Sequence, residues 1–277
     1  MADITRKQEI KPMAKKRNSS KNGLYPKLEL SGEIRNSKLF NNDTTKKVPF
    51  SVVEAYKNLR VHLTSILKEQ NIKVIAITSP NASEGKSTTA VNTAIVLSQL
   101  NKKVVLVDAD ARRSTVHSKL KLQNKIGCLD VMVGKEPLKK AIQPYNQCLD
   151  IITAGSDISG TSELFCSSSF DRLLTDLSAM YDYVIVDTPP VNLVSDSLVI
   201  SQKCEGVLLV VRSSITTYAA FKKAYSSIEK LNINVLGTVI NGVGSKSDKY
   251  YKYDKYKYGY GYGSYGYGYG YYGKDKK

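Results

Sequence analysis

Residues 74–88 read VIAITSPNASEGKST, and the fold is predicted first from this stretch. Its first five residues form an unbroken apolar run, which is typical of a strand buried on both faces. The loop that follows ends in Gly85, Lys86 and Ser87, where a helix is expected to begin. Backbone N–H groups at such a helix start bind phosphate, while the lysine reaches the β- and γ-phosphates and the hydroxyl binds Mg²⁺. The stretch therefore predicts a phosphate-binding loop, although Pro80 replaces the first glycine of the GxxxxGK[ST] pattern.

Apolar runs and amphipathic segments alternate along the rest of the chain. The predicted strands are Val104–Val107, Ile151–Thr153, Val184–Val186, Val207–Val211 and Val235–Ile240, and the predicted helices are Ser51–Ile66, Ser87–Leu100, Phe170–Met180, Leu193–Ser201 and Tyr218–Leu231. Strands that alternate with helices build a parallel sheet with helices on both faces. The sequence thus predicts a doubly wound, mostly parallel α/β domain whose ligands bind beyond the carboxyl ends of the strands.

The two ends of the chain differ in composition from its middle. Residues 1–47 carry 12 Lys/Arg against 5 Asp/Glu, and residues 245–277 carry 8 Lys against 3 Asp. These segments hold +7 and +5 of the net charge of +16, which leaves +4 for the middle. Charged polar ends are usually solvated arms, so no nucleic-acid partner is predicted. We predict a flexible basic arm over 1–47, a nucleotide-binding domain over 48–245 and a disordered tyrosine-rich tail over 246–277.

The same composition bears on the compartment. No stretch approaches the roughly 20 consecutive apolar residues that span a bilayer. The four cysteines lie far apart and lack CxxC spacing, which fits a reducing compartment better than a disulfide framework or a zinc site. A cytoplasmic protein is therefore predicted.

Acidic residues follow two other predicted strands. Asp108 and Asp110 come directly after Val104–Val107, and Asp187 comes directly after Val184–Val186. An acidic residue that ends a buried strand orients Mg²⁺ in P-loop phosphoryl-transfer enzymes. A helix cap would explain one carboxylate of the first pair, but it explains two less well. Because parallel strands end at the same edge of a sheet, we expect all three carboxylates near Lys86.

Three segments together carry a family resemblance. VIAITSPNASEGKSTTA (74–90), LVDADARR (106–113) and YVIVDTPP (183–190) resemble the Walker A, A′ and B motifs of bacterial tyrosine kinases (BY-kinases). The free-standing cytoplasmic kinases of Gram-positive capsule and exopolysaccharide operons are the most similar members. The resemblance spans about residues 49–244 and implies a P-loop fold of the deviant Walker, MinD-like type.

The resemblance also implies ATP and Mg²⁺ as cofactors and a role for each motif residue. It assigns nucleotide binding to Ser83, Glu84, Gly85, Lys86, Ser87, Thr88, Arg212 and Asn241, metal binding to Ser87, Asp108 and Asp187, and catalysis to Lys86, Asp108 and Asp110. Arg212 and Asn241 fall in segments expected to border the adenine. A tyrosine hydroxyl with an ordinary pKa near 10 needs a proton acceptor, for which Asp108 is expected and Asp110 is the alternative.

The tail is the implied substrate. The resemblance predicts autophosphorylation in trans at Tyr250, Tyr251, Tyr253, Tyr256, Tyr258, Tyr260, Tyr262, Tyr265, Tyr267, Tyr269, Tyr271 and Tyr272. The lysines between them are expected to favour approach to Asp108 and Asp110. The implied role is control of capsular or exopolysaccharide synthesis, with a separate transmembrane activator that holds the kinase at the inner face of the membrane. A phosphotyrosine phosphatase is the implied third partner.

Two further segments match family motifs in part. Glu54, Lys57 and Arg60 resemble the ExxRxxR oligomerisation motif, with Lys57 in place of the first arginine, and predict a homo-oligomer. A solvated charge stripe with local ion pairs is the alternative. Gly160–Phe165 matches the NPSELL-like loop of the family incompletely.

Two other functions compete with a kinase. A membrane-positioning or partition ATPase of the deviant Walker type would carry its signature lysine at Asn81 and its glycine pair at Ala82 and Ser83, and this chain has neither. An assembly module that binds ATP without catalysis stays open.

Overall fold

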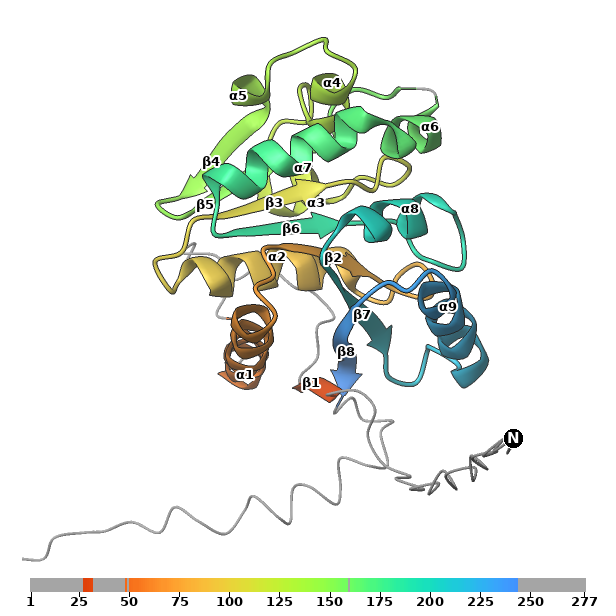
Figure 1. The fold of residues 1–277 in the computed structure, drawn as a ribbon. Coiled ribbons are helices and arrows are strands. Elements are labelled where there is room, and N and C mark those ends of the chain that lie inside the picture. Colours follow the sequence, from red (N-terminus) through yellow and green to blue (C-terminus); the bar gives the residue numbers. More distant parts are fainter. Residues whose placement is uncertain (1–26, 32–47, 49, 159, 244–277) are drawn as a thin grey trace, which may run out of the picture.

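The computed structural model describes residues 27–31, 48, 50–158 and 160–243 (Figure 1). The strands in the described residues are β1 (Lys27–Ser31), β2 (Val74–Thr78), β3 (Val104–Asp108), β4 (Ile142–Asn146), β5 (Leu149–Ile152), β6 (Tyr183–Asp187), β7 (Gly206–Arg212) and β8 (Val235–Val243). They form one sheet in the order β1-β8-β7-β2-β6-β3-β5-β4. Only β4 and β5 pair antiparallel among these strands. The predicted mostly parallel sheet is confirmed.

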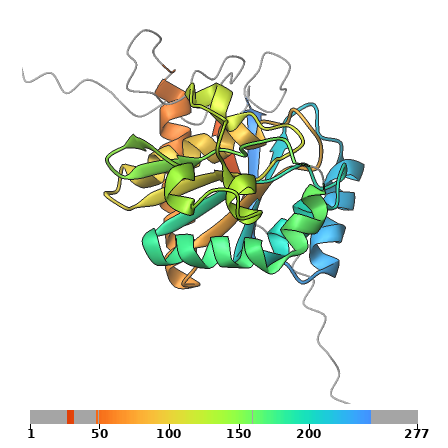
Figure 2. The same cartoon turned by 90° about the horizontal axis from the view of Figure 1, so that it is seen from above.

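Helices cover both faces of this sheet (Figures 1 and 2). Within the described residues they are α1 (Phe50–Glu69), α2 (Lys86–Ser98), α3 (Val116–Leu120), α4 (Cys128–Met132), α5 (Leu138–Ala141), α6 (Thr161–Cys166), α7 (Ser168–Met180), α8 (Asp196–Lys203) and α9 (Tyr218–Lys230). Alternate side chains of a strand point to opposite faces. Ile75 and Ile77 accordingly pack with α1 and α2, whereas Ala76 packs with α9 on the other face. The continuous apolar runs of the strands are thus explained, because both faces are buried.

Strand order places the predicted motifs side by side. β2 lies between β6 and β7, and β6 also pairs with β3. The backbone register pairs Asp187 with both Ile77 and Asp108. The chain leaves β2 through α2 towards β3, and it crosses back over β2 on its way from β6 to β7. The carboxyl ends of β2, β3 and β6 therefore meet at one point, where the sheet changes its direction of winding.

Several elements were not predicted. β1 lies inside the segment expected to be a flexible arm, so that expectation is corrected for Lys27–Ser31, whose backbone pairs in parallel with β8. Only two leucines alternate in its sequence KLELS, which is too weak a pattern to indicate a strand. β4 (IQPYN) is a polar edge strand with a proline, and α3 to α6 are too short to show a helical period.

The rest of the arm and the whole tail, including its predicted phosphorylation sites, lie outside the described residues. The domain boundaries at 47/48 and 245/246 therefore stay predictions. Among the described residues, no helix combines the length and the apolar character that crossing a bilayer requires.

Candidate active site

The loop after β2 is held in shape by its own buried carboxylate. Glu84 is almost fully buried, and its Oε2 accepts a hydrogen bond of 2.8 Å from the backbone N–H of Asn81. Its Oε1 accepts one of 2.6 Å from the hydroxyl of Thr216, which follows β7. Gly85 has a φ of +95°, a conformation that favours glycine, and it leads directly into α2. The predicted phosphate-binding loop thus has a backbone fixed by side-chain contacts.

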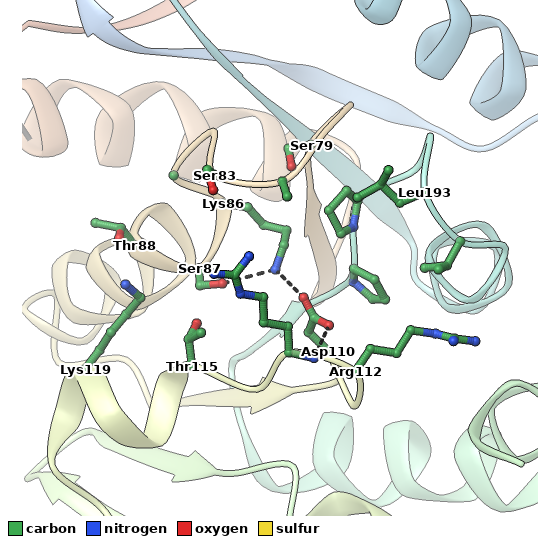
Figure 3. A pocket seen from close by; sticks show the side chains of 16 residues that line it. Ser79, Ser83, Lys86, Ser87, Thr88, Asp110, Arg112, Thr115, Lys119 and Leu193 are labelled. Carbon is green, nitrogen blue, oxygen red and sulfur yellow. Dashed lines mark hydrogen bonds and ion pairs between the residues drawn. The ribbon is translucent and has the colours of Figure 1, made fainter. Parts of the chain in front are cut away.

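Lys86 lies between two carboxylates at the base of this loop. Its Nζ is 3.1 Å from Asp110 Oδ2, 3.0 Å from Asp187 Oδ1 and 3.1 Å from Ser87 Oγ (Figure 3 shows the contacts with Asp110 and Ser87). Burial opposes the charged form of Lys86, but Asp187 and Asp110 outweigh it and raise its pKa. Burial raises the pKa of Asp187, and Lys86 opposes that shift. Lys86 and Asp187 therefore form a buried ion pair, in which each group counteracts the effect of burial on the other.

Asp187 retains an unused acceptor. Its Oδ2 is buried and forms no hydrogen bond within the part of the chain that the structure describes. A buried carboxylate oxygen without a partner costs free energy unless a ligand satisfies it. This oxygen lies at the predicted metal site.

Asp108 is turned away from solvent. Its Oδ2 accepts hydrogen bonds from Ser114 Oγ at 2.8 Å and from the backbone N–H of Val116 at 3.1 Å, and its Oδ1 accepts one from the N–H of Asp110 at 3.2 Å. Burial and the neighbouring Asp187 raise the pKa of Asp108 to about 7. The carboxylate of Asp108 thus organises the loop after β3, whereas that of Asp110 reaches Lys86.

A cavity of about 340 Å³ opens in front of these groups (Figure 3). Its lining consists of Ser79, Ala82, Ser83, Gly85, Lys86, Ser87, Thr88, Asp110, Arg112, Arg113, Thr115, Lys119, Pro189, Pro190, Leu193 and Val194. Asp110 is in this lining, and the fully buried Asp108 is not. Of the predicted nucleotide-binding residues, five line it: Ser83, Gly85, Lys86, Ser87 and Thr88. This is the site predicted at the carboxyl edge of the sheet.

Three cations of this lining were missed as functional residues. Arg112 and Arg113 lie two and three residues after Asp110, and Lys119 lies on α3. Neither Arg113 nor Lys119 forms an ion pair with another described residue. The repeated arginines of LVDADARR were a visible signal, but the position of Lys119 depends on a helix too short to predict. The rim is therefore cationic, which suits polyphosphate.

Arg212 and Asn241 lie behind the loop, outside the lining of the cavity. Arg212 Nη1 donates to the carbonyl of Ser83 at 3.1 Å. Asn241 Nδ2 donates to the carbonyl of Glu84 at 3.0 Å and to Thr89 Oγ1 at 3.2 Å. A Cβ built on Gly85 would collide with this amide. Both residues, expected at the adenine, hold the loop backbone from β7 and β8.

The predicted oligomerisation residues lie on α1, away from the cavity. Lys57 Nζ is 2.7 Å from Glu54 Oε1, and both side chains are partly exposed. Arg60 Nη1 lies 3.3 Å from the carbonyl of Val96 and from Gln99 Oε1 at the end of α2. All three residues thus have partners within their own subunit.

Sequence comparisons place the chain among kinases. A family model described as an AAA domain matches residues 72–234. The tyrosine-protein kinase YwqD of Bacillus subtilis is 34% identical over 80% of this chain and 94% of its own length. The putative tyrosine-protein kinase CapB of Staphylococcus aureus is 30% identical over 78% of this chain and 95% of its own length. The tyrosine-protein kinase etk of Escherichia coli is 32% identical over 82% of this chain, which spans 33% of etk.

Solved structures agree with this grouping. The chimerical protein CapA2B2 matches with a TM-score of 0.70 and 30% identity, covering 78% of this chain and 93% of its own. The kinase domain of the Escherichia coli tyrosine kinase ETK matches with a TM-score of 0.72 and 29% identity, covering 89% and 95%. The septum site-determining protein MinD of Pyrococcus horikoshii, 23% identical with a TM-score of 0.55 over 64% of this chain and 73% of its own, shares the fold. The chain belongs to the bacterial tyrosine kinases.

Proposed function

We propose that this kinase transfers the γ-phosphoryl group of ATP to tyrosines of its own C-terminal tail, in trans within a homo-oligomer, and thereby regulates capsular or exopolysaccharide synthesis. One observation carries the chemistry: Lys86 and Asp110 meet at the base of a cavity whose rim is cationic. The cations neutralise the triphosphate, and the loop amides fix its orientation.

The transfer forms one bond, breaks one bond and moves one proton. The tyrosine oxygen forms a bond with the γ-phosphorus, the bond from that phosphorus to the β,γ-bridging oxygen breaks, and ADP leaves. The hydroxyl proton passes to a carboxylate. We assign this step to Asp110, because Asp110 lines the cavity and because Lys86 would release it on turning to the phosphates. Asp108 positions the loop that carries Asp110.

The residues of the site fit a magnesium ion. Mg²⁺ takes oxygen ligands, retains water and in nucleotide sites uses one or two carboxylates together with phosphate oxygens. Asp187, with its unpartnered buried oxygen, and the hydroxyl of Ser87 would hold it, and Asp108 stands next to Asp187 in the register. Mg²⁺ bound there neutralises charge on the phosphates. No group of three acidic, histidine or cysteine side chains in the described residues could hold a metal unaided.

Partners and location belong to the same proposal. The similarity to the chimerical protein CapA2B2 supports an activator supplied to this kinase by a separate chain. A membrane-spanning activator would hold the kinase at the inner face of the membrane, and a phosphatase would reset the tail. Partition-type ATPases carry their signature lysine at the position of Asn81, so the asparagine here argues against that class.

Incubation of the full chain with ATP and Mg²⁺, followed by detection of phosphotyrosine, tests the proposal. We expect phosphotyrosine in the wild type and its loss when the 12 tyrosines between 250 and 272 are changed to Phe. Asp110→Asn should lose transfer while it still binds ATP. The exposed α7 variant Asp176→Asn makes the same chemical change away from the site and should behave as wild type. Hydrolysis of ATP without any phosphotyrosine would instead support the ATPase.

A further inference from the structure

A second cavity adjoins the first. It has a volume of about 490 Å³, within the range of about 300–1,000 Å³ that ligand pockets occupy. Its lining consists of Ala111, Arg112, Asp157, Ile158, Gly160, Thr161, Ser162 and Glu163. Arg112 lines both cavities, and it follows Asp110 by two residues. The second cavity therefore meets the first at Arg112, close in sequence to Asp110.

In the second cavity, the carboxylates are free of ion pairs with described residues and the arginine is not. Arg112 is held by Asp196, whose Oδ2 accepts from its Nε at 2.9 Å, and Ser162 Oγ donates to the other oxygen of Asp196. The charge of Arg112 is thus compensated by a buried partner. Asp157 and Glu163 are exposed, and neither forms an ion pair with a described residue. Within the described part of the chain, the first cavity presents cations without an ion pair, while the second presents carboxylates without one.

The chain itself contains a segment of matching charge. Residues 249–258 read KYYKYDKYKY, so each of their five tyrosines is next to a lysine; we call this the lysine segment. Residues 259–272 read GYGYGSYGYGYGYY, hold the other seven tyrosines of the tail and contain no lysine; we call this the glycine segment. A site that merely accepts tyrosine would use both segments alike.

We infer that the second cavity is the acceptor subsite of the kinase, in which Asp157 and Glu163 bind the lysines that flank a tyrosine, so that the lysine segment is phosphorylated in preference to the glycine segment. Arg112, which lines both cavities, marks the boundary between the subsite for the anionic nucleotide and the subsite for the cationic peptide. The inference rests on the proposed tail phosphorylation and adds to it a recognised peptide class. It also revises the expected approach of the tail, because Asp108 is fully buried and Asp110 is paired with Lys86.

Two synthetic peptides offered to the full chain test this subsite. One is the lysine segment, and the other is QYYQYDQYQY, which keeps every tyrosine and replaces each lysine by glutamine. At low ionic strength we expect kcat/KM for the lysine peptide to exceed that for the glutamine peptide by about tenfold, as two partly exposed charge contacts allow, and the ratio to fall with added salt. In Asp157→Asn/Glu163→Gln the ratio should fall towards one. In full-length chains of that variant, mass spectrometry should find phosphate shifted from the lysine segment towards the glycine segment.

The control variant Asp176→Asn/Glu229→Gln removes two exposed carboxylates from α7 and α9 and should retain the wild-type ratio. Equal use of both peptides by the wild type, or an undiminished preference in Asp157→Asn/Glu163→Gln, would overturn the subsite while the kinase assignment stood. A raised KM for ATP in that variant with an unchanged peptide ratio would assign the cavity to the nucleotide instead. If the wild type phosphorylated neither peptide nor its own tail, the proposed function itself would fail.

Discussion

Lys86 Nζ at the start of α2 and Asp187 Oδ1 at the end of β6 are 3.0 Å apart, and both side chains are buried. An ion pair thus lies at the base of the site, and a bound triphosphate would compete with Asp187 for the same lysine. The sequence predicted Lys86 as a phosphate-binding residue. Its burial between two carboxylates gives it a structural role as well.

Lys86→Met should therefore abolish phosphotyrosine formation and also destabilise the nucleotide-free protein. Removing one partner of a buried ion pair leaves the other unpaired, at a cost of about 3–5 kcal/mol. Urea unfolding followed by circular dichroism measures this loss. The double variant Lys86→Met/Asp187→Asn should recover much of the stability and none of the activity. Wild-type stability in Lys86→Met would mean that the pair does not hold the site together.

Asn241→Ala should weaken nucleotide binding because it loosens the phosphate-binding loop, and not because it removes a contact with the adenine. The Asn241 amide holds the carbonyl of Glu84 and the hydroxyl of Thr89, so its loss frees the backbone that must face the phosphates. We expect Kd for ATP to rise about tenfold, as for a loss of about 1.4 kcal/mol. Because the effect acts on phosphates, Kd for GTP should rise by the same factor in calorimetry. A rise in Kd for ATP but not for GTP would instead support the contact between Asn241 and the adenine that was expected from the sequence.

The main elements of the site were predictable for a physical reason. Buried parallel strands are continuous apolar runs, and the residue that ends each run must lie at the ligand edge, so Lys86, Asp110 and Asp187 could be placed together. The distinction between Asp108 and Asp110 could not be made, because it depends on hydrogen bonds from Ser114 and Val116 within an irregular loop. Contacts such as that of Asn241 with Glu84, 157 residues apart, carry no local signal.

Tyr56→Phe should change the alkaline stability of the protein. The Tyr56 hydroxyl is fully buried and forms no hydrogen bond among the described residues, and burial raises its pKa to about 12. In the unfolded chain it ionises near pH 10. Because folding favours the neutral form of Tyr56, its ionisation lowers the free energy of unfolding at alkaline pH. The stability that the raised pKa provides is complete below pH 10 and is lost as the pH rises towards 12, to a total of about 2–3 kcal/mol.

At pH 8 Tyr56→Phe should be as stable as the wild type or slightly more so, because it removes an unpaired buried polar group. The stability of Tyr56→Phe relative to the wild type, measured from urea midpoints, should increase from pH 10 to pH 11.5. Tyr218→Phe changes a tyrosine that is 77% exposed and should show no such growth. A constant difference between Tyr56→Phe and the wild type across this range would contradict the assignment.

Lys57→Glu is the sharpest test of the predicted homo-oligomer. Arg60 is unsuited to it, because its contacts with Val96 and Gln99 tie α1 to the end of α2, and its loss would disturb the subunit itself. Lys57 contacts only Glu54 among the described ion pairs, and a partly exposed pair of this kind contributes about 0.5 kcal/mol or less. Reversal of its charge should leave the fold intact.

If Lys57 binds a neighbouring subunit, light scattering should give a multiple of 30.7 kDa for the wild type and a mass near 30.7 kDa for Lys57→Glu. Lys222→Glu makes the same change on the exposed side of α9 and should keep the wild-type mass. Because one subunit is expected to phosphorylate the tail of another, dissociation of the oligomer should also make tail phosphorylation depend on protein concentration. An unchanged mass in Lys57→Glu would leave only the local pair with Glu54, and the three charges of α1 would then be a solvated stripe.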